Sequence, residues 1–215
     1  GNTFVYRAVE DDECLVNTVV VTELTKSDFV APYDQITARV VEDTEWEDTD
    51  CDGTGDGDPL EVTQDWYAQD DFGHTWYFGE ETIDEEGSTE GSWEAGKDVA
   101  GVGSFAEPGI VMLAHPDVST ADSVLAAPGL FYEQEFYEDE AEDMGKVKRL
   151  NTKVVLEMDN NIADEYTGCL QTKEWTALEP GAVEHKHYCP YTGLVLINEL
   201  SGGPTVRVEL VGINP

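Results

Sequence analysis

The residues with the clearest chemical meaning lie in one acidic loop, DTDCDGTGDGD, at positions 48–58. Aspartates occupy places one, three, five and nine of this loop, and a glycine occupies place six. Ca²⁺ prefers six to eight oxygen ligands, and this spacing lets the carboxylates converge on one point while the glycine makes a sharp turn. The sequence therefore predicts a calcium site. Its expected ligands are the side chains of Asp48, Asp50, Asp52 and Asp56 and the main-chain carbonyl of Thr54.

This loop resembles the D-x-D-x-D-G calcium loops of EF-hands, dockerins and thrombospondin type 3 repeats. It departs from an EF-hand at the twelfth place, where Pro59 stands instead of a bidentate glutamate. No predicted amphipathic helix flanks it. The resemblance therefore implies a calcium loop between strands, with Asp58 or Glu61 completing the ligand shell. The alternative is a solvated acidic turn without an ion.

Catalytic patterns are weak. No G-x-S-x-G, phosphate-binding loop, dinucleotide fingerprint or CxxC pair occurs. A glycosidase needs two carboxylates flanking a cleft, and four acids near aromatic residues are candidates for such a pair. They are Asp65, Glu80, Glu90 and Glu94. We expect a non-enzymatic protein with no catalytic or organic-cofactor residues, and a carbohydrate-active hydrolase is the alternative.

Two other patterns concern metals. His185 and His187 lie two residues apart on one predicted strand, and H-x-H on a strand can bind zinc. The residues expected to face them, Gln171 and Lys173, are not further ligands, which favours exposed strand histidines. The run of carboxylates at positions 138–143 is a candidate second cation site or a solvated face.

The composition limits the settings in which the chain can work. It has 47 Asp and Glu against 11 Lys and Arg, giving a formal net charge of −36. Such a surface repels nucleic acid and anionic lipid, and it repels its own copies unless cations screen it. High salt or an extracellular medium with divalent ions suits this charge, and the calcium loop favours the second. Five Trp, nine Tyr and seven Phe indicate a packed core rather than disorder.

The chain shows no sign of membrane insertion. No apolar run approaches the length of a membrane span. The chain begins at Gly1 with neither an initiator Met nor a signal peptide, so we expect a mature or trimmed segment.

Four cysteines allow three pairings. Residues 169–176 and 183–190 form a predicted hairpin centred near Glu179, which places Cys169 directly opposite Cys189. Facing positions bring Cβ atoms within about 4.5–5.5 Å, close to disulfide range. We therefore predict the bonds Cys169–Cys189 and Cys14–Cys51, the second of which would hold the calcium loop against the N-terminal strands. Disulfides imply an oxidising compartment, and free buried thiols are the alternative.

Runs of β-branched and aromatic residues predict strands along most of the chain. The predicted strands are 3–9, 15–24, 36–42, 60–70, 74–80, 92–94, 110–115, 130–137, 153–158, 170–175, 183–189, 194–199 and 205–210. In the hairpin of 60–70 and 74–80, a three-residue loop with a left-handed Gly73 would place Trp66 opposite Phe78 and Ala68 opposite Trp76. Residues 120–127 form the predicted short helix.

So many strands with short acidic connections predict an all-β, mainly antiparallel sandwich or barrel with at most one or two short helices. The aromatic hairpin should contribute most to the core, because each aromatic side chain buries about 150–250 Å². We expect one β-rich domain over residues 1–215.

Several short motifs extend this interpretation. They include DWYAQD at 65–70, WYFGE at 76–80, STEGSWEAG at 88–96 and EAED at 140–143, and they continue through LEPG at 178–181 and GLV at 193–195. In these motifs the chain resembles a family of uncharacterised bacterial proteins, mostly predicted to be exported. The resemblance implies export but no particular activity, so it assigns no catalytic residue. Compared with that family, residues 47–59 and 119–129 are insertions.

Together these patterns favour a secreted, calcium-stabilised, non-enzymatic β module with a structural, adhesive or self-assembly role, such as a surface-layer or filament subunit. Edge strands readily recruit another chain, so we expect a homo-oligomer or filament, with an extracellular glycan or protein as a further possible partner and no nucleic acid. Besides the hydrolase, the remaining alternative is a small-ligand carrier whose barrel holds an apolar molecule near Trp66 and Trp76.

Overall fold

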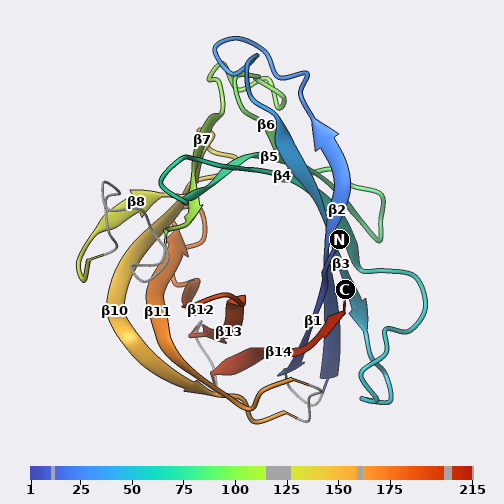
Figure 1. Ribbon diagram of the computed structural model, residues 1–215. Coiled ribbons are helices and arrows are strands. Elements are labelled where there is room, and N and C mark those ends of the chain that lie inside the picture. The colour runs from blue at the N-terminus through green and yellow to red at the C-terminus, as the bar shows by residue number, and fades with distance from the viewer. Residues whose placement is uncertain (11–12, 115–126, 159–161, 201–204, 215) are drawn as a thin grey trace.

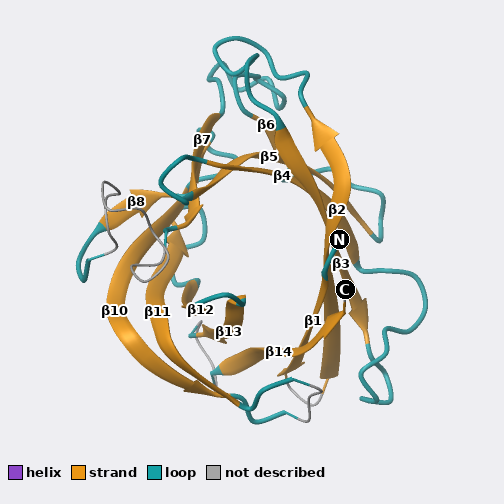
Figure 2. Ribbon diagram, in the orientation of Figure 1, coloured by secondary structure: helices purple, strands orange, loops and turns teal. Residues whose placement is uncertain are grey.

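The computed structural model describes residues 1–10, 13–114, 127–158, 162–200 and 205–214. Within them the chain forms strands and loops and no helix (Figure 2), so the predicted all-β, antiparallel class is confirmed. The strands are β1 (Thr3–Glu10), β2 (Glu13–Lys26), β3 (Ala38–Glu47), β4 (Glu61–Gln69), β5 (Thr75–Asp84), β6 (Trp93–Glu94), β7 (Glu107–Met112), β8 (Phe131–Glu133), β9 (Glu135–Phe136), β10 (Asp143–Val155), β11 (Glu165–Thr176), β12 (Val183–Cys189), β13 (Gly193–Glu199) and β14 (Val206–Asn214). The helix expected at 120–127 lies almost wholly outside the described residues.

The strands form one sheet that curves into a nearly closed barrel (Figure 1). Their order is β8-β10-β11-β12-β13-β14-β1-β2-β3-β4-β5-β7-β9, and β6 pairs with β5. The first and last members of this order, β8 and β9, are separated in the chain by Gln134 alone. Because β8 pairs with β10 and β9 pairs with β7, this short segment joins the two ends of the sheet.

The hairpin of β4 and β5 pairs largely as the sequence predicts. Ala68 lies opposite Trp76, as expected. The register shifts between Asp65 and Tyr67, so Trp66 has both Phe78 and Gly79 across from it instead of Phe78 alone. Gly79 has a φ of 126°, and a Cβ there would come within 2.3 Å of the Trp93 carbonyl oxygen. The approach of β6 therefore requires glycine at the bulge.

Both predicted disulfides are present. Cys169 and Cys189 join β11 to β12, and their pairing follows the register in which Leu170 faces Tyr188. Cys14 on β2 is bonded to Cys51 in the acidic loop. Disulfides persist in oxidising surroundings, so this chain folds in an oxidising, non-cytoplasmic environment.

The two faces of β4 have opposite character. Trp66 packs with Phe29 and Phe78 beneath the segment that follows β2. The segment that follows β2 lies outside the barrel wall (Figure 1), so the other face of β4 is the inner one. The alternating residues of that inner face line a cavity with residues of β2, β3 and β5. A second apolar core joins β1 to β10–β14 and includes the Cys169–Cys189 bond. The barrel interior is therefore partly apolar and partly polar.

Candidate functional site

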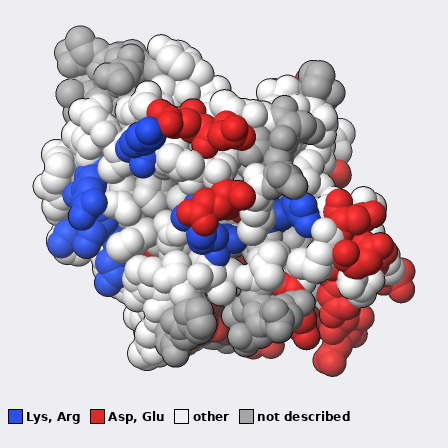
Figure 3. Space-filling view, turned by 90° about the horizontal axis from the view of Figure 1, so that it is seen from below, with Lys and Arg blue, Asp and Glu red and all other residues white. Residues whose placement is uncertain are grey.

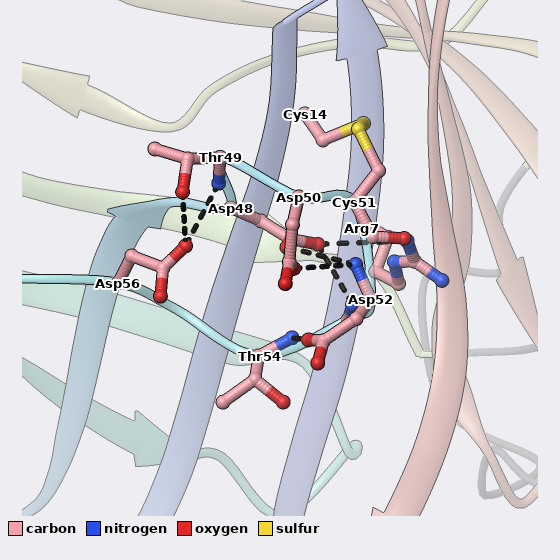
Figure 4. Close-up of polar contacts among 10 residues, drawn as sticks. Arg7, Cys14, Asp48, Thr49, Asp50, Cys51, Asp52, Thr54 and Asp56 are labelled. Atoms are coloured by element: carbon pink, nitrogen blue, oxygen red, sulfur yellow. Dashed lines mark hydrogen bonds and ion pairs between the residues drawn. A yellow bond between two sulfur atoms is a disulfide. The ribbon is translucent and has the colours of Figure 1, made fainter.

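The acidic loop between β3 and β4 gathers three of the four predicted aspartates. Asp48, Asp50 and Asp56 each offer a carboxylate oxygen, and these oxygens lie within 4.8 Å of one another (Figure 4). Converging carboxylates at this spacing suit a hard cation such as Ca²⁺. In the part of the chain that the structure describes, this is the only such group of three or more potential ligands.

Asp48 is the fixed member of the group. It is fully buried, and its carboxylate accepts hydrogen bonds from the amides of Asp52, at 3.0 Å, and Gly53, at 2.8 Å. Arg7 lies 3.5 Å from the same carboxylate and also donates to the Cys51 carbonyl at 2.8 Å. The loop backbone and β1 therefore hold Asp48 in place.

The carboxylates of Asp52 and Asp56 accept hydrogen bonds from other parts of the loop. The Asp52 carboxylate accepts a hydrogen bond from the Thr54 amide at 2.8 Å and lies outside the group of three. Asp56 is exposed and accepts hydrogen bonds from the Thr49 hydroxyl, at 2.5 Å, and the Thr49 amide, at 3.0 Å. These bonds lower the pKa of Asp56, so that carboxylate stays ionised.

A second acidic site lies inside the barrel. It is a cavity of about 230 Å³ formed by side chains of β2 to β5. Its lining residues are Asn17, Asp43, Glu45, Glu61, Thr63, Asp65, Tyr67 and Glu80. No Lys or Arg lines the cavity, and within the described ranges none of its five carboxylates forms an ion pair. The cavity wall therefore carries five carboxyls and no basic side chain.

Asp65 and Glu80 form a pair within this wall. They stand directly opposite each other on β4 and β5, and each has an oxygen 2.6 Å from the Tyr77 hydroxyl. A hydroxyl can donate only one hydrogen bond. One carboxyl accepts that proton, so the other must donate its own proton to the Tyr77 oxygen. The geometry therefore requires at least one of the two carboxyls to be neutral, since the carboxyl that accepts from Tyr77 can do so in either protonation state.

The pKa values agree with this shared proton. Burial, with the nearby charges of Glu80 and Asp43, raises the pKa of Asp65 to about 7. Burial, with the charges of Glu61 and Asp43, likewise raises the pKa of Glu80 to about 7. Burial also raises the pKa values of Asp43 and Glu45. Carboxyls poised near neutrality are typical of functional sites, because a ligand or a proton can decide their charge.

A neighbouring cluster holds two ion-paired carboxylates. Lys186 contacts Glu174 at 3.1 Å and Glu184 at 3.2 Å. Its charge also lowers the pKa of Asp43, although burial outweighs that effect. Lys186 is thus already shared between two acids and does not neutralise the cavity wall.

Other residues singled out in the sequence lie elsewhere. Glu94 is buried and paired with Lys26 and Lys97, and Glu90 lies in an exposed loop. His187 faces Gln171 as expected but is buried, at 7% exposure, so the expectation of an exposed histidine is wrong for this residue.

The aromatic residues proposed for an apolar ligand do not border the cavity. Trp66 lies in the core with Phe29, and Trp76 donates to Asp70 at 3.0 Å. In the acidic run at 138–143, Asp139 donates its amide to Glu142 in a tight turn. Among described residues this run forms no group of potential metal ligands.

The sequence pointed to Asp65 and Glu80 but missed Asp43, Glu45 and Glu61 as members of the same site. Their signal was the alternation of acids along residues 43–45 and 61–65, which is equally typical of a solvated face. Only barrel closure turns that face inward.

No protein-family model, curated protein or solved structure matches this chain. The resemblance to exported bacterial proteins therefore stays an expectation. Among the described residues, no helix has the length and apolar character needed to cross a bilayer. Fold and sites together define the molecule as an acidic, disulfide-bonded, all-β barrel with a polar interior cavity.

Proposed function

We propose that this protein is a non-cytoplasmic binding protein whose barrel holds a small cationic molecule in the interior cavity. The observation that carries the proposal is the set of five carboxylates around about 230 Å³ with no basic residue among them. A ligand with an ammonium or guanidinium group would supply the missing counter-charge. Sites of this kind are concave and largely preformed, with a few polar groups that fix orientation.

The size of the cavity limits the ligand. Its volume of about 230 Å³ lies below the roughly 300–1,000 Å³ of sites that hold drug-sized molecules. A molecule with fewer than about ten non-hydrogen atoms fits this volume better than a sugar chain or a lipid. The stacked rings of Tyr67 and Tyr77, 4.8 Å apart, stiffen one wall. The negative, hydroxyl-bearing lining favours a polar cation over the apolar molecule expected from the sequence.

Isothermal titration calorimetry with putrescine, agmatine, choline and Ca²⁺ tests this proposal. We expect an amine or guanidinium compound to bind, and we expect affinity to rise between about pH 6 and pH 8 as Asp65 and Glu80 lose their proton. Asp43→Asn should weaken binding, whereas Asp71→Asn in the exposed β4–β5 turn should not. Lack of binding by every organic cation at pH 8 would contradict the proposal.

A stabilising role for calcium is a second proposal, supported by the group of Asp48, Asp50 and Asp56. The Cys14–Cys51 bond ties this loop to β2, and the Asp48 amide donates to the Cys14 carbonyl at 2.9 Å. An ion bound there would fasten the loop to the barrel wall. Equilibrium dialysis with ⁴⁵Ca²⁺ tests this proposal, and absence of saturable binding at millimolar calcium would refute it.

The hydrolase alternative now has one specific feature in its favour. Asp65 and Glu80 place two carboxyls beside the cavity, at least one of them neutral, and acid–base hydrolysis uses such a pair with the neutral member as the acid. Turnover of small glycosides that disappears in Glu80→Gln would support it. The structural or adhesive role expected from the sequence stays a prediction.

A further inference from the structure

Four basic residues on β10 and β11 differ from the other cations of this acidic chain. Among the described residues, seven of the 11 Lys and Arg form ion pairs with carboxylates. Lys146, Lys148, Arg149 and Lys173 form none within the part of the chain that the structure describes. With 47 acids available in the sequence, this grouping of unpaired cations defines a distinct surface.

These four residues lie on the outside of the barrel. Lys148 and Arg149 are exposed, and Lys146 and Lys173 are half-buried. The residues that alternate with them, Val147, Thr172 and Glu174, are buried on the inner side. We call the four cations, together with Phe131 and Trp175, the basic face.

The lysines of the basic face contact aromatic rings instead of carboxylates. Lys146 and Lys173 stand directly opposite each other on β10 and β11, an arrangement of like charges that destabilises a sheet. Lys146 lies over the Phe131 ring at 4.3 Å, and Lys173 lies over the Trp175 ring at 4.9 Å. The two rings meet edge to face with centroids 6.1 Å apart, and Phe131 is 55% exposed. Exposed aromatic rings among cations form a surface suited to an acidic partner.

The positive charges of the basic face also affect a histidine on the next strand, β12. The pKa of His185 on β12 is lowered, first by burial and then by the charges of Lys148, Lys173 and Arg149. The lowered pKa favours the neutral form of His185, so the positive charge of the basic face comes from its lysines and arginine.

The opposite side of the same molecule is strongly acidic. Figure 3 shows basic side chains gathered on the side where Figure 1 places β10, and acidic side chains on the side of the loop that follows β3. The exposed acids of that loop are Glu47, Asp50, Asp52, Asp56 and Asp58. One copy of the chain thus carries both complementary surfaces.

We propose that the basic face binds the acidic loop at residues 47–58 of a second copy of this chain in a head-to-tail contact. The basic face and the acidic loop lie on opposite sides of the molecule, so one two-fold contact cannot use both surfaces of each copy. The interface is therefore heterologous, and such contacts produce rings or open filaments. The overall charge of −36 opposes association. Salt near 0.15 M screens that repulsion beyond about 8 Å, whereas pairs in contact are screened less.

Sedimentation velocity on the intact, disulfide-bonded protein in chelator tests the contact. We expect concentration-dependent association at 0.15 M NaCl that is lost at 1 M NaCl. Lys146→Glu/Lys173→Glu should weaken it by at least about tenfold, because like charges would then face each other across the interface. The matched control Arg39→Glu changes an exposed cation that pairs loosely with Glu23, at 3.9 Å, and should leave association unchanged.

Reversing the charges of both surfaces distinguishes a specific contact between them from a nonspecific effect of the net charge. Glu47→Lys/Asp58→Lys alone should also abolish self-association. Mixed with Lys146→Glu/Lys173→Glu, it should form a complex, because the reversed loop of one variant meets the reversed face of the other. A monomer at every salt concentration overturns the proposal, as does a mixture that fails to associate or a basic face that binds heparin while the protein stays monomeric.

Discussion

Glu174 and Lys186 approach to 3.1 Å inside the barrel, and the remaining hydrogen-bonding capacity of Glu174 is also filled. Its carboxylate accepts bonds from Thr172 at 2.6 Å, Gln134 at 2.9 Å and Tyr188 at 3.2 Å. A buried charge with a full set of partners is stable, but it depends strongly on each partner. This cluster ties β11 and β12 to Gln134, the residue that links β8 to β9.

Lys186→Met should destabilise the protein by about 2–4 kcal/mol, because it leaves Glu174 buried without its counter-charge. Urea unfolding followed by tryptophan fluorescence measures the change. Lys173→Met is the matched control, since that side chain lies on the outer surface without an ion pair among described residues, and it should change stability by less than about 0.5 kcal/mol. Equal losses in both variants would show that Lys186 adds nothing beyond packing.

Asp65→Asn should remove the decrease in the free energy of unfolding that the Asp65 carboxyl causes as pH rises. The pKa of Asp65 is about 7 in the folded protein against an ordinary value of 3.8. Between these values the folded state holds a proton that the unfolded state has lost, so this residue makes the free energy of unfolding fall as pH rises from about 4 to about 7. The variant should match the wild type near pH 4 and exceed it at pH 8, by on the order of 1–3 kcal/mol. Denaturant titrations at both pH values check this, and a less stable variant at pH 8 would count against it.

Calcium at 10 mM should raise the melting temperature relative to chelator. Extracellular sites bind with dissociation constants on the order of 10⁻⁴–10⁻³ M, so mass action gives about 1–3 kcal/mol and a rise of roughly 3–8 °C. Asp50→Asn should remove most of this rise, because Asp50 belongs to the group of three carboxylates. Asp58→Asn, in the same loop but outside that group, should keep it. Identical melting curves with and without calcium would exclude a stabilising ion.

Removing the Cys14–Cys51 bond should weaken calcium binding more than removing the Cys169–Cys189 bond. Cys51 sits between Asp50 and Asp52, whereas Cys169 and Cys189 lie in the second apolar core. Cys169→Ala/Cys189→Ala should instead cost about 2–5 kcal/mol of stability, since it removes a cross-link and buried sulfur atoms together. Calcium titrations and urea unfolding of both double variants separate the two effects.

Local geometry explains which sequence predictions succeeded. The Cys169–Cys189 bond follows from a hairpin whose turn fixes the register, so counting residues from Glu179 was sufficient. In the acidic loop, the spacing places the carboxylates of Asp48, Asp50 and Asp56 close together. The Asp52 carboxylate instead accepts a hydrogen bond from the Thr54 amide, which is two residues further along the chain.

The residues that line the cavity could not be predicted from local sequence spacing. Asp43, Glu61 and Glu80 lie on three different strands, and a polar stripe on a strand looks the same whether it faces water or a barrel interior. The inward direction depends on which face the aromatic core covers. Here Phe29, from the segment between β2 and β3, packs on the outer face and leaves the acids inside.

The pairing of β1 with β14 makes the resistance of the barrel to a pulling force depend on where the force is applied. Thr3 pairs with Asn214, so the two ends of the described chain lie at the same end of one antiparallel ladder. Hydrogen bonds in such a ladder run perpendicular to the strands. A pull applied between these two points loads the bonds one pair at a time, like a zipper, whereas a pull along the length of β10 and β11 would shear many bonds together.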